Sequence, residues 1–279
     1  MCKVRFIFFI ALAFYSTDSS AQVLIGPVVG GHVGWATFER NNEVKDTVRV
    51  KPYLGFHVGG SISFRVRKKF FLQTSILYSR KGKVIEGKKD TDLLNDAKYN
   101  YLEMPILYTA EFKGKLGKKS NKEFKWYIGA GPTVSYWLGG KGVLINSDLD
   151  ESDIKSLPYK LTFDKKREED VKEGEMNIKD ANRIQLALNI SAGLILEPVG
   201  FNKIMVALRY ELGHSFLSRS GRGFFGGLEK YNIVKGYEDE LQVRMQTLNM
   251  SLFYFIDLKT DQRKKGKSTI KINKGRSKK

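Results

Sequence analysis

The chain has almost no cysteine: Cys2 is the one cysteine among its 279 residues. It lies in a segment with two basic residues, Lys3 and Arg5, then the apolar stretch Phe6–Tyr15, then Ser19-Ser20-Ala21. This order is typical of a secretory signal peptide, and we expect residues 1–21 to be removed by cleavage after Ala21. The mature chain then contains no cysteine, which excludes disulfides and thiol chemistry.

Long hydrophobic runs are also lacking. No segment after the signal peptide offers the ~20 consecutive apolar residues of a membrane-spanning helix, which excludes a helical membrane protein. The three histidines, His32, His57 and His214, are not spaced like the ligands of a metal site. The glycine-rich stretch Gly221–Gly227 is typical of a flexible loop rather than a phosphate-binding motif. We therefore expect neither a metal nor another cofactor.

Acidic residues are too few to balance the basic ones, and the net charge is +18. Such a charge often indicates nucleic-acid binding, but an exported chain rarely meets nucleic acid, and we expect none. Much of the excess lies in Lys259–Lys279, and a second cluster lies in Lys113–Lys125. We interpret residues 259–279 as a basic tail that is solvated or contacts lipid phosphates, with a docking peptide as the alternative.

What the chain does contain is a repeated alternation of apolar and polar residues. In Arg183–Glu197 every even position is apolar, and the odd positions are mostly polar or small, with Ile195 the exception. Successive side chains of a strand point to opposite faces, so this segment predicts a long strand with one apolar face. Seven further segments are similarly alternating or extended: Leu24–Phe38, Lys51–Arg67, Phe70–Lys83, Tyr99–Phe112, Phe124–Gly139, Lys203–Gly213 and Val243–Leu258. Strands of this number and length predict an all-β fold, an eight-stranded antiparallel up-and-down transmembrane β-barrel spanning residues 22–258.

The connections between these strands alternate in length. Short or moderate links follow the second, fourth and sixth strands, at residues 67–69, 113–123 and 198–202. The other links are long: Glu39–Val50, Val84–Lys98, Gly140–Asn182 and His214–Gln242. Short periplasmic turns and long extracellular loops are typical of outer-membrane barrels. We expect extracellular loops at 140–182 and 214–242, the first exposed or partly mobile, and the tail in the periplasm.

The lumen of an eight-stranded barrel is only wide enough for side chains. Alternation places several charged or titratable residues on its inner face, including His32, His57 and Glu197. Buried charges must be paired, so we predict that Glu103, Glu111 and Glu211 oppose Arg65, Arg183 and Arg209 in a structural ion-pair network. A proton or solute path is the alternative. Aromatic residues near the strand ends suit interfacial girdles: Trp35, Tyr78, Trp126, Tyr136, Tyr210 and Tyr254.

Three segments resemble a known family. GFHVGGSISFRVRKKFFLQTSILYSRKGK (Gly55–Lys83), YLEMPILYTAEF (Tyr101–Phe112) and YIGAGPTVSYWLGG (Tyr127–Gly140) are similar to strands of the PorT-like outer-membrane β-barrel family of Bacteroidota. The resemblance implies an integral protein of the Gram-negative outer membrane. For the founding member it also implies a role in type IX protein secretion and gliding-associated export.

Three functions follow as hypotheses. We predict a non-enzymatic barrel that is a structural or accessory component of an envelope assembly such as type IX secretion. Its partners would be outer-membrane lipid and other secretion or envelope proteins, contacted through the loops or the tail. One alternative is a surface barrel that binds a ligand through loop residues such as Trp137, Phe224 and Phe225. The other is a lipid hydrolase that uses His214 and Ser215 near Glu211, although adjacent strand residues point to opposite faces.

Overall fold

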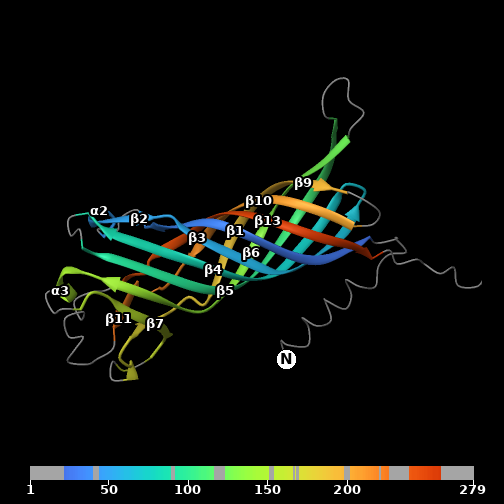
Figure 1. Cartoon of the computed structure of the whole chain (residues 1–279). Coiled ribbons are helices and arrows are strands. Elements are labelled where there is room, and N and C mark those ends of the chain that lie inside the picture. Colours follow the sequence, from blue (N-terminus) through green and yellow to red (C-terminus); the bar gives the residue numbers. More distant parts are fainter. Residues whose placement is uncertain are drawn as a thin grey trace, which may run out of the picture.

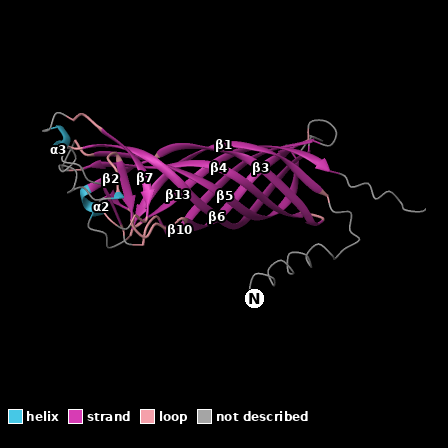
Figure 2. Ribbon diagram, turned by 90° about the horizontal axis from the view of Figure 1, so that it is seen from below, coloured by secondary structure: helices cyan, strands magenta, loops and turns pink. Residues whose placement is uncertain are grey.

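Eight long antiparallel strands close into a ring in the computed structural model (Figure 1). The structure describes residues 22–39, 44–88, 92–115, 123–150, 154–165, 167, 170–197, 202–219, 221–225 and 239–258, so the predicted signal peptide and basic tail lie outside the described residues. The ring strands, in chain order, are β1 (Val23–Phe38), β3 (Tyr53–Arg67), β4 (Phe70–Gly87), β5 (Leu94–Lys115), β6 (Glu123–Ile145), β9 (Ile184–Leu196), β10 (Asn202–Phe216) and β13 (Val243–Leu258). Each pairs with the next, and β13 pairs with β1 to close the cylinder (Figure 2). The predicted eight-stranded up-and-down barrel is confirmed.

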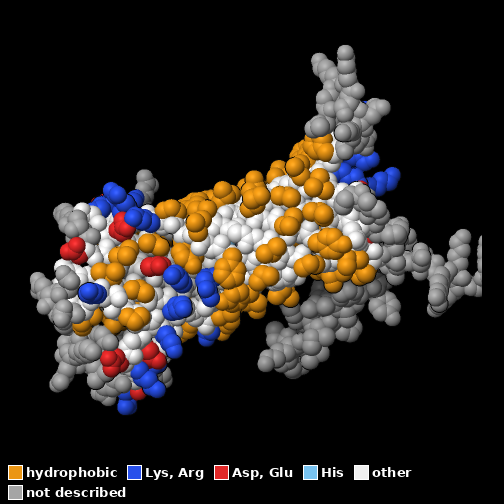
Figure 3. Space-filling view, in the orientation of Figure 1, with side chains coloured by type: hydrophobic (Ala, Val, Ile, Leu, Met, Phe, Trp, Pro, Cys, Tyr) orange, Lys and Arg blue, Asp and Glu red, His pale blue; other side chains and the backbone are white. Residues whose placement is uncertain are grey.

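Burial follows the alternation that the sequence displays. On β9, Ile184, Leu188 and Ile190 are each more than half exposed on the outer face, whereas Asn189 and Ser191 are buried inside. Ile195, the exception in the alternation, is buried in the lumen. On the face in Figure 3, hydrophobic side chains cover the middle of the barrel, and most charged side chains gather at one end. We call this the long-loop end, and the opposite end, which carries the turn at residues 67–69, the short-turn end.

Aromatic side chains lie on the outer face near both ends. At the long-loop end Trp35 lies 6.4 Å from Tyr210 between ring centroids. At the short-turn end Trp126 stacks on Phe112 at 4.6 Å. Two bands of aromatic side chains separated by an aliphatic belt are the arrangement expected of interfacial girdles.

The lumen is filled in three layers. An apolar layer near the short-turn end contains Phe71, Tyr127, Phe253 and Phe255. A polar layer follows at mid-height. A second apolar layer, at the long-loop end, is built around Trp137, which is fully buried.

Above this second apolar layer the chain forms a folded cap. The cap consists of the long-loop ends of β4, β5 and β6 together with β7 (Leu157–Phe163), β8 (Glu175–Ile178), β11 (Arg222–Phe225) and β12 (Asp239–Glu240). β7 pairs with β6, and β8, β11 and β12 extend the same sheet in that order. On the other side β2 (Val48–Lys51) pairs with β4.

The prediction that residues 140–182 form an exposed or partly mobile loop is wrong for the described part of that segment. Leu157, Tyr159, Met176 and Ile178 are buried in the cap. The physical reason is that β6 continues past the ring, and its free edge offers backbone groups with which β7 pairs. In this segment β7 contributes three buried apolar residues and β8 two, a pattern too short to stand out in a charge-rich sequence.

Two short helices complete the described elements, α2 (Val44–Thr47) and α3 (Ser147–Asp150). Within the described ranges neither helix is long enough or apolar enough to cross a membrane.

Trp137 connects the barrel to the cap. Its ring lies 5.1 Å from that of Tyr99 on β5 and 4.9 Å from that of Phe163 on β7, both edge-on. Its Nε1 donates a hydrogen bond to the carbonyl oxygen of Gly139 at 3.1 Å.

We expect Trp137→Ala to lower the free energy of unfolding by ~3–5 kcal/mol, because it leaves a large cavity between barrel and cap. Urea titration of the folded protein in detergent micelles, followed by circular dichroism, measures the loss. Leu138→Ala is the matched control, because Leu138 is the next residue and points outward. Equal losses for the two variants would contradict this account of the core.

Candidate functional site

The polar layer of the lumen centres on Lys81, an inward-facing residue of β4. Its Nζ lies 2.5 Å from Oε1 of Glu211 on β10 and also pairs with Glu103 on β5. Arg209 Nη2 lies 3.8 Å from the second carboxylate oxygen of Glu211. The four side chains are no more than 6% exposed. Two cations and two anions thus form a buried ion cluster without net charge, which is the condition under which such groups are tolerated in an interior.

The structure brings together three of the six residues expected in a lumen network, namely Glu103, Arg209 and Glu211. Lys81, which holds the two glutamates, was not among the expected residues. Both faces of Phe70–Lys83 mix polar and apolar residues, so the alternation there does not reveal which side faces inward.

The other three residues lie away from this cluster, so the expectation of one network that contains all six residues is corrected. Arg183 lies at the long-loop end, with its guanidinium 4.7 Å above the Tyr136 ring and its Nε donating to the Trp137 carbonyl oxygen. Arg65 is exposed near the short-turn end, 5.3 Å above the Phe71 ring. Glu111 also lies near the short-turn end. These positions are too far along the strands for their side chains to reach the middle of the barrel. Period-two alternation indicates the face on which a residue lies, but not its height in the barrel.

Glu197, which alternation placed on the inner face, is exposed at the short-turn end. Its carboxylate accepts a hydrogen bond from Lys125 Nζ at 2.6 Å, and Lys203 Nζ lies 3.5 Å away. Both lysines come from neighbouring strands, so this exposed group links β6, β9 and β10.

Two histidines lie beside the ion cluster, each over a glycine of the neighbouring strand. β1 and β3 pair Gly30 with His57 and His32 with Gly55. The two imidazole rings are stacked with centroids 5.9 Å apart. A Cβ atom on Gly55 would lie 2.2 Å from His32 Nε2, and one on Gly30 would lie 2.5 Å from His57 Nε2. The glycines therefore provide the space that both rings occupy.

Hydrogen bonds between strands complete the polar layer. His57 Nε2 lies 2.8 Å from Ser251 Oγ. Asn189 Nδ2 donates to Thr133 Oγ1 at 2.6 Å, and the hydroxyls of Tyr127 and Ser191 are 2.9 Å apart. Each of these hydrogen bonds joins side chains of two different ring strands, so the polar layer helps to hold the strands of the ring together.

The half of the lumen toward the short-turn end is closed. Two small voids lie there, of about 10 and 20 Å³. A cavity of that size holds about one water molecule. The arrangement resembles a packed core with a polar centre rather than a conduit.

A second buried ion pair lies in the cap. Lys83 Nζ lies 2.7 Å from Asp239 Oδ1, and both side chains are fully buried. Asn95 donates a hydrogen bond to the same carboxylate, and the Tyr159 hydroxyl donates to Asn95 at 2.6 Å. Burial raises the pKa of the Asp239 carboxyl, and the Lys83 ammonium opposes the shift. This chain of contacts ties β4, β5, β7 and β12 together, and the sequence pattern indicated neither Lys83 nor Asp239.

The proposed hydrolase constellation is not assembled. Ser215 Oγ accepts a hydrogen bond from the backbone N–H of Leu186 at 2.9 Å. His214 is exposed on the outer face, and Glu211 points into the lumen toward Lys81. A nucleophile needs its base within hydrogen-bond reach, and these three side chains do not provide that.

The aromatic residues proposed as a ligand surface lie mainly inside. Trp137 is fully buried, and Phe225 is 8% exposed and packs edge-on against Tyr159 at 5.2 Å. Phe224 is half-buried beneath the Lys179 ammonium, 4.7 Å away. Because the cap folds, residues expected on loops became core residues, which corrects this expectation.

Comparisons with known proteins give one family match and several similar solved structures. A family model described as outer membrane protein beta-barrel domain matches residues 14–217. OprG from Pseudomonas aeruginosa is similar with a TM-score of 0.43 and 9% identity over 86% of this chain and 96% of that one. Neisserial surface protein A gives 0.36 and 11%, over 86% and 99%. Ail of Yersinia pestis, solved with the heparin analogue sucrose octasulfate, gives 0.33 and 12%, over 85% and 100%. A search of curated proteins found no match.

We expect Gly55→Ala to lower the free energy of unfolding by ~1–3 kcal/mol, because the added methyl overlaps the His32 ring and the Arg80 carbonyl oxygen. Gly60→Ala on the same strand is the matched control, since no atom lies within 4 Å of its added Cβ. The loss of stability in each variant is measured from the urea concentration at which half of the protein is unfolded. A loss for Gly60→Ala as large as that for Gly55→Ala would show that backbone flexibility, not space for His32, is what β3 requires.

We expect Lys81→Met to cost ~3–5 kcal/mol of unfolding free energy, because it leaves two buried carboxylates facing one arginine. Adding Glu103→Gln should recover part of this loss, because one cation and one anion then remain. Lys98→Met, which removes a half-exposed lysine of β5, should change stability little. The prediction fails if the double variant is less stable than Lys81→Met.

Proposed function

Because the chain belongs to the outer membrane protein beta-barrel domain family, we propose that it acts as a non-enzymatic structural or accessory component of an envelope assembly such as type IX protein secretion. It is an outer-membrane β-barrel protein. In the proposed orientation the long-loop end and the cap face outward and the short-turn end faces the periplasm.

The observation that carries this proposal is the sealed lumen beneath a folded cap. Among the described residues, two apolar layers and a neutral ion cluster fill the interior and leave no wide path for solutes. The activity of the protein must then reside in its outer surfaces. The cap offers such a surface, and it is rigid because it has its own core and a buried ion pair.

The role in type IX secretion is supported by the resemblance to the PorT-like family. The three similar segments lie on β3, β4, β5 and β6, four consecutive strands that form one wall of the barrel. β4, β5 and β6 are also the strands that extend into the cap. The part of the barrel that resembles that family therefore includes the strands from which the cap extends.

The exposed lysines of the cap identify where a partner would bind. Lys141 on β6 and Lys160 on β7 are directly paired and both point outward. Two like charges that lie opposite each other on adjacent strands repel. An acidic partner would offset this repulsion, so the lysine pair favours binding of such a partner.

A gene deletion tests the proposal directly: we expect impaired protein export, with wild-type protein restoring it. A strain carrying Lys141→Glu and Lys160→Glu should lose partner proteins that co-purify with the tagged wild type from solubilised outer membranes. Arg67→Glu with Lys69→Glu, an equal charge change at the short-turn end, is the control. Unchanged secretion, gliding and envelope integrity after deletion would refute the role in secretion.

A further inference from the structure

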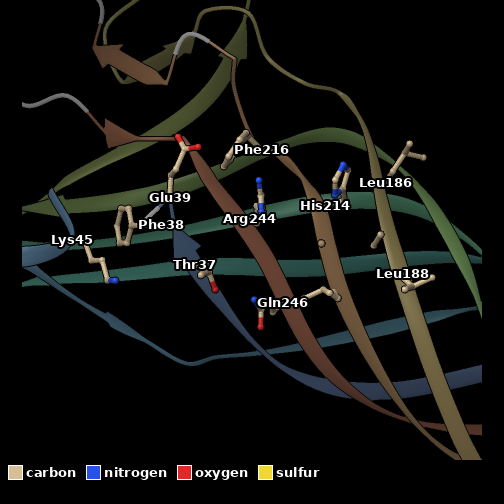
Figure 4. A pocket seen from close by; sticks show the side chains of 13 residues that line it. Thr37, Phe38, Glu39, Lys45, Leu186, Leu188, His214, Phe216, Arg244 and Gln246 are labelled. Carbon is tan, nitrogen blue, oxygen red and sulfur yellow. The ribbon is translucent and has the colours of Figure 1, made fainter. Parts of the chain in front are cut away.

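A groove of about 710 Å³ lies on the outer face of the barrel at the long-loop end (Figure 4). Four neighbouring strands, β1, β13, β10 and β9, contribute its walls. Its aliphatic part is formed by Leu186, Leu188 and Leu212 and its basic part by Arg244, Lys45 and His214. None of these residues takes part in the ion cluster of the lumen.

A bulge in β10 creates the groove. Leu212 pairs with Gln246 and Phe216 pairs with Arg244, so three residues of β10 lie opposite Met245 alone. A Cβ on Gly213 would lie 2.2 Å from the Met245 carbonyl oxygen, so the bulge depends on glycine at this position. The backbone pairing of β10 with β9 also ends after Gly213. There the backbone N–H of Leu186 donates a hydrogen bond to the side-chain Oγ of Ser215 instead.

The chemistry of the groove is that of an amphiphile-binding site with an anionic end. The three leucines are about half exposed on the outer face, continuous with the aliphatic belt. The Arg244 guanidinium lies 4.5 Å above the Phe216 ring, which orients it. Glu39 is the one acidic residue among the described lining residues, and against it Arg244 and Lys45 give these residues a net positive charge.

The height of the groove matches the boundary between acyl chains and headgroups. The Trp35–Tyr210 pair of the aromatic band lies just below it, and the Tyr210 hydroxyl donates to Gln246 in the groove wall at 2.7 Å. Aromatic bands mark the membrane interface. Basic side chains directly above such a band are at the level of lipid phosphates.

We propose that this groove is a specific binding site for a phosphorylated lipid of the leaflet around the long-loop end. The phosphate binds to Arg244 and Lys45, and an acyl chain lies along Leu186, Leu188 and Leu212. The inference rests on the membrane placement of the barrel and is independent of any role in secretion.

The test uses the purified full chain, refolded in detergent, and native mass spectrometry with lipid A or with a phosphate-free form that carries the same acyl chains. Arg244→Gln should weaken lipid A binding about tenfold, because a charge-assisted hydrogen bond is worth ~1.5–3 kcal/mol and ~1.4 kcal/mol is a factor of ten. Lys45→Gln should act in the same direction. The phosphate-free lipid should bind the wild type weakly and be insensitive to both substitutions.

Arg49→Gln is the matched control, because it removes one exposed arginine of β2 near the same end but outside the groove. Heat-modifiable gel migration establishes that each variant is folded before binding is measured. Equal binding of both lipids, or equal weakening by Arg49→Gln and Arg244→Gln, would overturn the proposal and indicate attraction by surface charge alone. Because the assay needs no cells, its failure is distinguishable from a failure of the proposed role in secretion.

Discussion

The width of an eight-stranded ring is the constraint on which the rest of this structure depends. Each ring strand pairs with two neighbours, so the ring has no free edge, which is the requirement for strands in a hydrocarbon environment. The same closure leaves a lumen that side chains alone can fill. Every residue on the inner face must therefore fit its neighbours, as the Gly30–His57 and Gly55–His32 pairs on the adjacent strands β1 and β3 show.

This constraint also explains the form of the ion cluster. Charges in so narrow a space lose contact with water, and two apolar layers separate this cluster from both ends of the barrel. Lys81 serves two carboxylates from two different strands, and Arg209 balances the second of them. Such a cluster contributes more to specifying the register and position of the strands than to the net free energy of unfolding. Any shift of β4 against β5 or β10 would leave a charge unpaired.

Because packed side chains fill the interior, we assign the recognition of partners and ligands to the outer surface and the cap. The cap forms because β4, β5 and β6 continue past the ring and offer a sheet edge to the segments that follow. The groove at Arg244 has a related origin, since it lies where β10 leaves its regular pairing with both neighbours. Both features arise at the long-loop end, where strands differ in length and the closed ring no longer dictates the pairing.

The sequence by itself determined the number of ring strands, their order and, for the strands with clear alternation, which face points outward; Phe70–Lys83 was the exception. It did so because period-two alternation over many residues is a local property: the predicted strand at Arg183–Glu197 corresponds to β9 within one residue at each end. It also placed Glu103, Arg209 and Glu211 on the inner face, but it did not indicate Lys81, Lys83 or Asp239.

Only the tertiary structure decided which charges meet, because partners such as Lys81 and Glu211 are 130 residues apart in sequence. Their contact depends on the height of each residue along its strand and on the register between strands. The cap, too, depends on a free edge of β6 that exists only once the ring has closed.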